Sequence, residues 1–259
     1  MRQDGGSLRR FTVPKAHGDR ARAALPTGHK ALETARTRYP SSVVHPAQAP
    51  RMLVSGHNQA KIGATVQKGP WAGMPIFTLT LEERATCPAT CAVWSECYGN
   101  STPFARRLIH GAALEQRLMR EVAALLERHN KIAVRLHILG DFYSAQYAEM
   151  WQMLLAAHPG LHLFGFTAWD RVSPIGRVVC DMNTEYPARC GIRFSMAEPT
   201  GQPMDAVTLW GGETREGTIM CPAQTDGTDC CATCGLCWAP AAAQHAIGFV
   251  GHGGYKRRT

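Results

Sequence analysis

The chain has 259 residues, of which 45% are hydrophobic, with ten cysteines and 28 lysine and arginine residues against 20 acidic ones. This length allows one domain with a large core, and no apolar run reaches the roughly 20 residues of a membrane span or forms a secretory leader. These features exclude a membrane protein and a secreted disulfide scaffold, so we expect a cytoplasmic protein whose clustered cysteines serve metal binding or catalysis.

Residues 1–50 combine positive charge with weak hydrophobic periodicity. Residues 1–61 hold eleven Lys or Arg against three acids, whereas residues 62–259 hold 17 of each sign, so the net charge of +8 lies in the N-terminal quarter. Frequent Pro, Gly, Ser and Ala predict a basic, loosely structured extension over residues 1–50. Such an arm can bind nucleic-acid phosphates, although a solvated leader without a partner explains the same composition.

Strand and helix patterns alternate from residue 75 onward. Short apolar or β-rich runs predict strands at residues 75–81, 132–142, 161–169, 191–198 and 206–212. A long amphipathic helix is expected within 103–130, and a second helix at 144–160, where Ser144 is an N-cap. This alternation indicates parallel βα units, so residues 51–215 are expected to form an α/β core that is a partial or complete (β/α) barrel.

Polar side chains stand where the predicted strands end. Asp141 ends the second strand, Thr167 the third and Ser195 the fourth. Because the carboxyl ends of parallel strands meet at one edge, we expect these side chains to face a common site. A turn-capping role for Asp141, and hydrogen bonds within the strand ends for Thr167 and Ser195, explain the same residues without a ligand.

Three cysteines follow the first strand within "TCPATCAVWSECYGN", spaced as Cys87-x3-Cys91-x5-Cys97. Three thiolates on one loop suit an iron–sulfur cluster with an open fourth iron, or a zinc site completed by a remote ligand. Structural zinc sites usually pair C-x2-C elements, which this loop lacks. The spacing therefore favours a three-cysteine cluster.

The C-terminal segment, residues 216–259, is rich in cysteine. Three of its cysteines have ferredoxin-like spacing and a fourth lies nine residues before the run of Cys230 and Cys231, which gives the set Cys221, Cys231, Cys234 and Cys237. Four thiolates would close the coordination shell of a second [4Fe–4S] cluster with an electron-transfer or structural role, and structural zinc is the alternative. Cys230 is then spare or an alternative ligand, and Cys180 and Cys190 are expected to be isolated thiols.

The strand, the cysteine loop and the following helix resemble the radical SAM superfamily, whose C-x3-C-x2-C loop has an aromatic residue beside its last cysteine. Tyr98 has that place here, and three more residues precede the last cysteine. The resemblance implies a [4Fe–4S] cluster that binds S-adenosylmethionine, an electron donor as partner, and a 5'-deoxyadenosyl radical as the reactive species. It also implies that the cofactor site includes Tyr98, Gly140, Asp141, Thr167 and Ser195.

A closer resemblance is carried by "NQAKIG", "LTLEERATCPATC", "HILGDFYS", "FGFTAW" and "CATCGLCW", which are similar to the phage and prophage family called gene product 88. It covers about residues 55–250 and implies an architecture and a phage setting, hence the host cytoplasm, more than a reaction. An enzyme of this setting that modifies a nucleobase in DNA would need both a radical site and a basic segment to bind phosphates.

Two other classes of protein remain open. A nucleic-acid-binding or processing protein could use its clusters or zinc ions only to brace the fold, with the basic N-terminal segment binding phosphates. A zinc hydrolase would need a histidine or carboxylate beside the cysteines and an activated water. His57 and His137 are its candidates, and His137 alternates with apolar residues in a strand, which favours a structural role.

Overall fold

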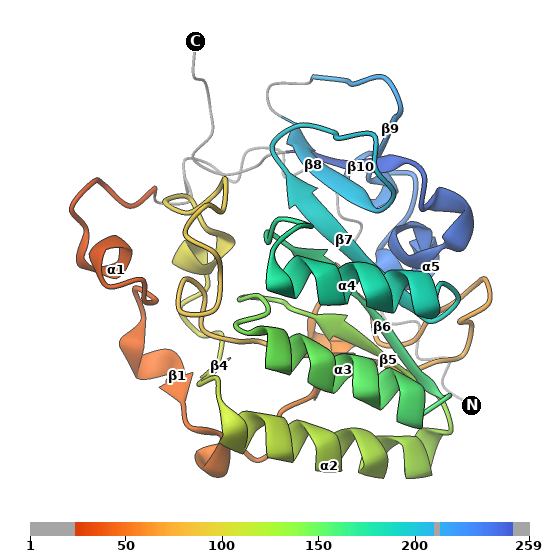
Figure 1. Ribbon diagram of the computed structural model, residues 1–259, viewed down its shortest axis with the longest axis horizontal. Helices are drawn as coiled ribbons and strands as arrows, with labels where there is room; N and C mark the ends of the chain where they lie inside the picture. The colour runs from red at the N-terminus through yellow and green to blue at the C-terminus, as the bar shows by residue number, and fades with distance from the viewer. Residues whose placement is uncertain (1–23, 210–212, 251–259) are drawn as a thin grey trace, which may run out of the picture.

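The computed structural model describes residues 24–209 and 213–250 and has an eight-stranded sheet with the strand order β2-β3-β5-β6-β7-β8-β10-β9 (Figure 1). These strands are β2 (Val54–Ser55), β3 (Ile76–Thr78), β5 (Ile132–Leu136), β6 (Leu161–Thr167), β7 (Cys190–Met196), β8 (Asp205–Leu209), β9 (Thr218–Met220) and β10 (Ala246–Val250). All neighbours in this sheet pair in parallel except β2 and β3. The five strands expected from the sequence are all present, and the α/β class is confirmed.

The expected barrel does not close within the described residues. β2 and β9 form the two edges of the sheet, so no strand pairing joins its ends. One edge is occupied by antiparallel β2, and at the other β10 inserts between β8 and β9, which breaks the sequential strand order of a barrel. No α-helix or 3₁₀-helix crosses over between β7 and β8. The protein therefore has an open, mostly parallel sheet.

Three helices cover one face of the sheet and lie side by side in Figure 1: α2 (Ala112–His129), α3 (Ala145–Ala157) and α4 (Pro174–Glu185). α2 buries the apolar positions that the periodicity indicated, among them Leu118 and Val122. It begins later than expected, because Arg107–Leu108 forms strand β4, which pairs with β1 (Val43–Val44). At the start of α3, the Ser144 hydroxyl accepts the N–H of Tyr147 at 3.1 Å, which confirms the predicted cap.

The second face of the sheet is covered by irregular segments from two distant parts of the chain, one before β3 and one after β9. The indole rings of Trp71 and Trp238 stack with centroids 5.1 Å apart, and Phe164 of β6 packs on Trp238 at 4.5 Å. Backbone hydrogen bonds join the short helix α5 (Cys231–Cys234) to residues 61–62. These contacts hold the cysteine-rich segment against the sheet.

The described part of the N-terminal extension, residues 24–50, packs on the loop that carries the first three cysteines. It includes α1 (Lys30–Glu33) and β1. The Tyr39 hydroxyl donates to the carbonyl of Asn100 at 2.7 Å, and the N–H of Leu25 donates to the carbonyl of Ser95 at 3.0 Å. The rest of the predicted basic arm, residues 1–23, lies outside the described residues. Within the described parts of the chain, no helix has the length and apolarity needed to cross a bilayer.

Candidate metal centres

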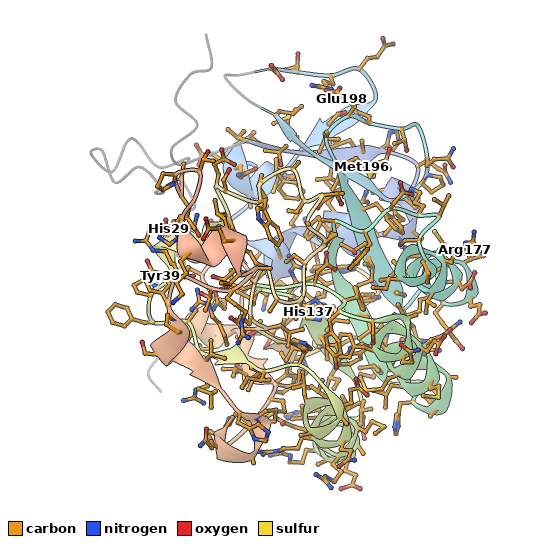
Figure 2. The ribbon with its side chains drawn as sticks, turned by 60° about the vertical axis from the view of Figure 1, so that its left-hand side comes forward. His29, Tyr39, His137, Arg177, Met196 and Glu198 are labelled. Atoms are coloured by element: carbon orange, nitrogen blue, oxygen red, sulfur yellow. The ribbon has the colours of Figure 1, made fainter. Side chains whose placement is uncertain are left out.

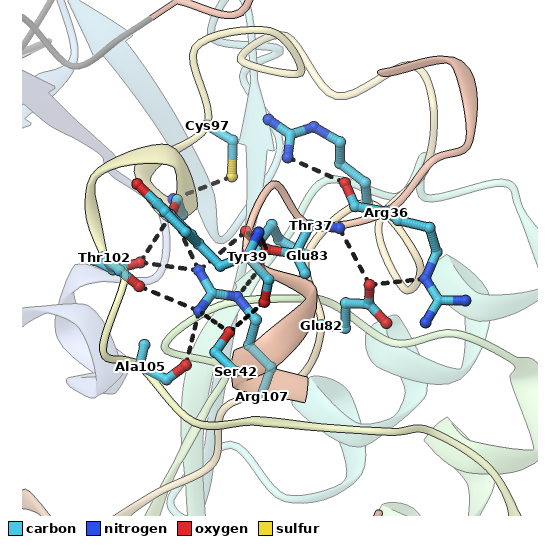
Figure 3. A network of polar contacts seen from close by, with 12 residues as sticks. Arg36, Thr37, Tyr39, Ser42, Glu82, Glu83, Cys97, Thr102, Ala105 and Arg107 are labelled. Carbon is cyan, nitrogen blue, oxygen red and sulfur yellow. Dashed lines mark hydrogen bonds and ion pairs between the residues drawn. The ribbon is translucent and has the colours of Figure 1, made fainter. Parts of the chain in front are cut away.

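A buried ion pair supports the first cysteine loop. Glu83 and Arg107 are almost entirely inaccessible to solvent, and Arg107 Nε lies 2.6 Å from Glu83 Oε2 (Figure 3). The same guanidinium donates to the carbonyls of Gly99, Thr102 and Ala105 at 2.7–3.1 Å. One arginine therefore ties the end of the loop to the start of it.

Neighbouring charged residues extend this support. Arg84 donates to the Asn100 side chain at 2.5 Å and to the carbonyl of Trp94 at 3.2 Å, so it links three parts of the loop. Glu82 accepts hydrogen bonds from Arg36 and from the N–H of Thr37. The sequence interpretation missed these residues, although three consecutive charged residues directly before a cysteine motif are a signal, because buried charges need partners.

Cys87, Cys91 and Cys97 lie close enough to influence one another electrostatically. All ten cysteines are free thiols. Burial, followed by the negative charges of Asp141 and Cys97, raises the pKa of Cys87 well above its usual value. Burial raises the pKa of Cys97 to about 11, against the opposing effect of the Gly99 N–H. A metal bound here would therefore have to displace protons from the thiols.

Asp141 lies beside these thiols and links the ends of β5 and β6. Its Oδ1 accepts the N–H of Phe142 and its Oδ2 the N–H of Ala168, both at 2.7 Å. Burial raises its pKa to about 7 despite these hydrogen bonds and one from Thr167. The expected grouping of Asp141 and Thr167 with the first three cysteines is thus seen, and part of their hydrogen-bonding capacity serves the backbone.

We call Cys87, Cys91 and Cys97 the rim set, and their place at the ends of the strands the rim. Gly140 and Tyr98 were predicted to belong to a cofactor site there, and their relation to it is indirect. Gly140 has φ of +82°, and a Cβ there would lie 2.6 Å from both Leu81 Cβ and Thr86 Oγ1. Glycine is therefore required by the close approach of the cysteine loop. Tyr98 begins a short 3₁₀-helix, Tyr98–Ser101, and its side chain is 43% exposed.

The second cysteine set lines a cavity of about 280 Å³ on the other face of the sheet. The strands contribute their penultimate residues to its wall: Arg135, Phe166, Ser195, Thr208 and Phe249. The C-terminal segment contributes its four expected ligands: Cys221, Cys231, Cys234 and Cys237. The structure thus places Ser195 with the second cysteine set. Cys230 is buried and is not part of the lining.

The thiols around this cavity are strongly perturbed. Burial raises the pKa of Cys237 to about 12, and the nearby Arg193 acts in the opposite direction. Burial also raises the pKa of Cys231, with Cys237 adding to the effect and Arg135 opposing it. The same interactions connect both thiols to Cys221 and Cys234, so the four form one electrostatic group.

Within the described ranges, no three or more His, Cys, Asp or Glu side chains are arranged so that they could hold one metal ion. A single zinc ion needs every ligand sulfur at about 2.3 Å from one point. The ligands of an iron–sulfur cluster each bind a different iron, so they surround a larger space. Thiol sulfurs are the ligand type that both kinds of centre use.

None of the remaining candidates lines the cavity of the second cysteine set. The His137 ring is buried, with Nε2 3.0 Å from the Tyr147 hydroxyl, and burial lowers its pKa to about 3. His57 lies in the 3₁₀-helix Gly56–Asn58. Cys190 is buried in β7, and Cys180 is half-buried on α4.

The fold and the two cysteine sets define a mixed α/β protein with thiol clusters on one large sheet. Residues 52–240 match the family model described as gene product 88, and the chain belongs to this family. The resemblance to the gene product 88 family that its motifs indicated is thereby confirmed. No curated protein and no solved structure gives a match.

Proposed function

We propose that this protein is a radical SAM-like iron–sulfur enzyme of phage type with two [4Fe–4S] clusters. The observation that carries the proposal is the grouping of seven thiols into two sets on one parallel sheet. Three lie with Asp141 where β3 and β5 lead into loops, and four surround the cavity on the second face. The carboxyl ends of parallel strands are the usual place for such sites.

Cys87, Cys91 and Cys97 would hold the first cluster and leave one iron open for S-adenosylmethionine. When bound and reduced, such a cluster supplies an electron to this cofactor. The chain's own part is to hold the loop through Glu83 and Arg107, both buried. Asp141, with its pKa raised to about 7 by burial, would accept a hydrogen bond from the cofactor's amino group.

The other proposed cofactor residues are Thr167, Tyr98, Gly140 and Ser195, and they differ in how they could act. Thr167 lies beside Asp141, and Tyr98 follows the third cysteine directly. Gly140 would act through the backbone by allowing the cysteine loop to approach. Ser195 lines the second cavity, so a cofactor held at the rim would have to extend there to meet it.

The decisive experiment uses anaerobically purified, dithionite-reduced protein. Adding S-adenosylmethionine should change the electron paramagnetic resonance spectrum, and 5'-deoxyadenosine and methionine should appear. Cys91→Ala should abolish both, whereas Cys234→Ala, which leaves the rim set intact, should keep the spectral change. Unchanged spectra in wild type, or identical behaviour of the two variants, would contradict the proposed rim site.

A nucleic acid is the proposed substrate class, and the alternative function is nucleic-acid binding with purely structural clusters or zinc. Both ideas are supported by the excess positive charge of residues 1–61. In the described part, Arg36 is already paired with Glu82 at 2.7 Å. Removing residues 1–23 should weaken DNA binding and flatten its dependence on salt. Affinity that is absent, or unchanged by this truncation, contradicts a role for the arm.

A further inference from the structure

Arg135 is a half-buried cation without an anionic partner in the described part of the protein. It is the penultimate residue of β5 and lines the cavity of the C-terminal cysteine set. A guanidinium has five N–H donors, and among the described residues Arg135 makes one hydrogen bond, from Nη1 to the carbonyl of Leu136 at 2.9 Å. None of the ion pairs in the described ranges involves it.

Aromatic rings fix the position of this guanidinium. Its Cζ lies 4.6 Å from the centroid of the Phe166 ring and 5.8 Å from that of Phe164. Both rings belong to β6 and also line the cavity. Contacts of this kind stabilise a cation only partly, so the unused donors remain available to an occupant of the cavity.

Arg193 shows what a fully satisfied buried arginine looks like in this protein. Its guanidinium donates to four backbone carbonyls, those of Cys237, Asp205, His245 and Ala242, at 2.9–3.1 Å. It therefore ties the C-terminal segment to the sheet. Arg135 has no comparable set of acceptors among the described residues, and the groups whose ionisation would favour its charge are Cys231 and Cys237.

A charge that is partly removed from water without compensation is destabilising. The four cysteines become thiolates when they bind iron or zinc. Their total negative charge is then larger than the positive charge of the metal core, so the centre is an anion. An anionic metal–thiolate centre in this cavity would compensate Arg135. A set of neutral thiols would not.

We infer that Arg135 is the counter-ion of the C-terminal metal–thiolate centre, a positioning residue that retains the centre and raises its reduction potential. The inference rests on the proposed function only for the identity of the metal as iron. Positive charge and hydrogen bonds near the sulfurs favour the reduced, more negative state of a cluster. Partners of this kind affect metal affinity by about tenfold to a hundredfold.

The test uses the full chain with Cys87, Cys91 and Cys97 replaced by alanine, so that only the C-terminal centre contributes. In this background Arg135→Gln, Arg135→Lys and Arg177→Gln are compared. Arg177 is exposed on α4, which makes it a matched control for loss of one positive charge (Figure 2). Redox titration monitored by electron paramagnetic resonance gives the potential, and a chelator gives the rate of iron loss.

Arg135→Gln should titrate at a more negative potential than the other two proteins and lose iron about tenfold faster. Arg135→Lys, which keeps the charge, should stay near the parent. Equal potentials and equal iron loss in all variants would overturn the inference. If the site holds zinc, the iron–sulfur proposal fails, and zinc release decides alone: faster release from Arg135→Gln supports the role of Arg135, and an unchanged rate refutes it.

Discussion

Arg107 and Glu83 form a buried ion pair that organises the first cysteine loop, with Nε 2.6 Å from Oε2. The residues are 24 positions apart in the chain and enclose all three cysteines of the loop. Thr37 donates to the same carboxylate at 2.8 Å, so the N-terminal region joins this support. The arrangement of Cys87, Cys91 and Cys97 therefore depends on the buried pair that holds the loop.

Glu83→Gln should destabilise the protein by about 3–5 kcal/mol, because it leaves the Arg107 guanidinium buried without its counter-charge. Urea unfolding of the anaerobically purified protein measures this change. The variant should also retain less iron in the rim set. Glu198→Gln is the control, since Glu198 pairs with Arg215 at the surface and its side chain is 69% exposed. That change should alter stability by less than about 1 kcal/mol, and equal effects of the two variants would refute the role of the buried pair.

Gly140→Ala should destabilise the protein more than Gly73→Ala. Both glycines have a positive φ, +82° and +84°, so the backbone strain of the two substitutions is matched. A Cβ at Gly140 would collide with Leu81 and Thr86, whereas nothing lies within 4 Å at Gly73. We expect a cost of about 1 kcal/mol at Gly73 and at least about 2 kcal/mol more at Gly140 in thermal or urea unfolding. Similar costs would show that the loop does not pack here.

His137 should make the protein less stable as the pH falls. The unfolded chain binds a proton at this imidazole near the ordinary histidine pKa of 6.5, while burial lowers the pKa of the ring in the folded protein to about 3. Acid therefore favours the unfolded state between these values. Between about pH 7.5 and about pH 5, wild type should lose roughly 2 kcal/mol more of its unfolding free energy than His137→Phe. Parallel pH profiles would contradict a buried, neutral histidine.

Local patterns in the sequence predicted α2, α3 and five of the strands, but not β1, β2, β4, β9 or β10. The apolar spacing indicated the buried face of α2, and Ser144 marked the start of α3. The order of the strands was beyond local patterns, because the pairing of β10 with β8 joins residues about 40 positions apart. An antiparallel edge strand as short as Val54–Ser55 leaves almost no periodicity to detect.

The candidate sites were predictable to a similar degree. Cysteine spacing predicted which thiols lie together, because residues close in sequence remain close in space. The residues that support them were not identified. Arg135 has the sequence context of an ordinary strand residue, and only the fold brings it to the cavity that the C-terminal cysteines line. Ser195 was expected beside Asp141, and the pleat of β7 directs it to the second face instead.

Metal analysis of the anaerobically purified protein decides whether the two cysteine sets each bind an iron–sulfur cluster. Wild type should contain about eight iron and about eight sulfide per chain. Replacing Cys87, Cys91 and Cys97 with alanine should remove about half of the iron, and replacing Cys231, Cys234 and Cys237 the other half. A colourless protein with stoichiometric zinc, or depletion of one and the same cluster by both sets of replacements, would contradict the account.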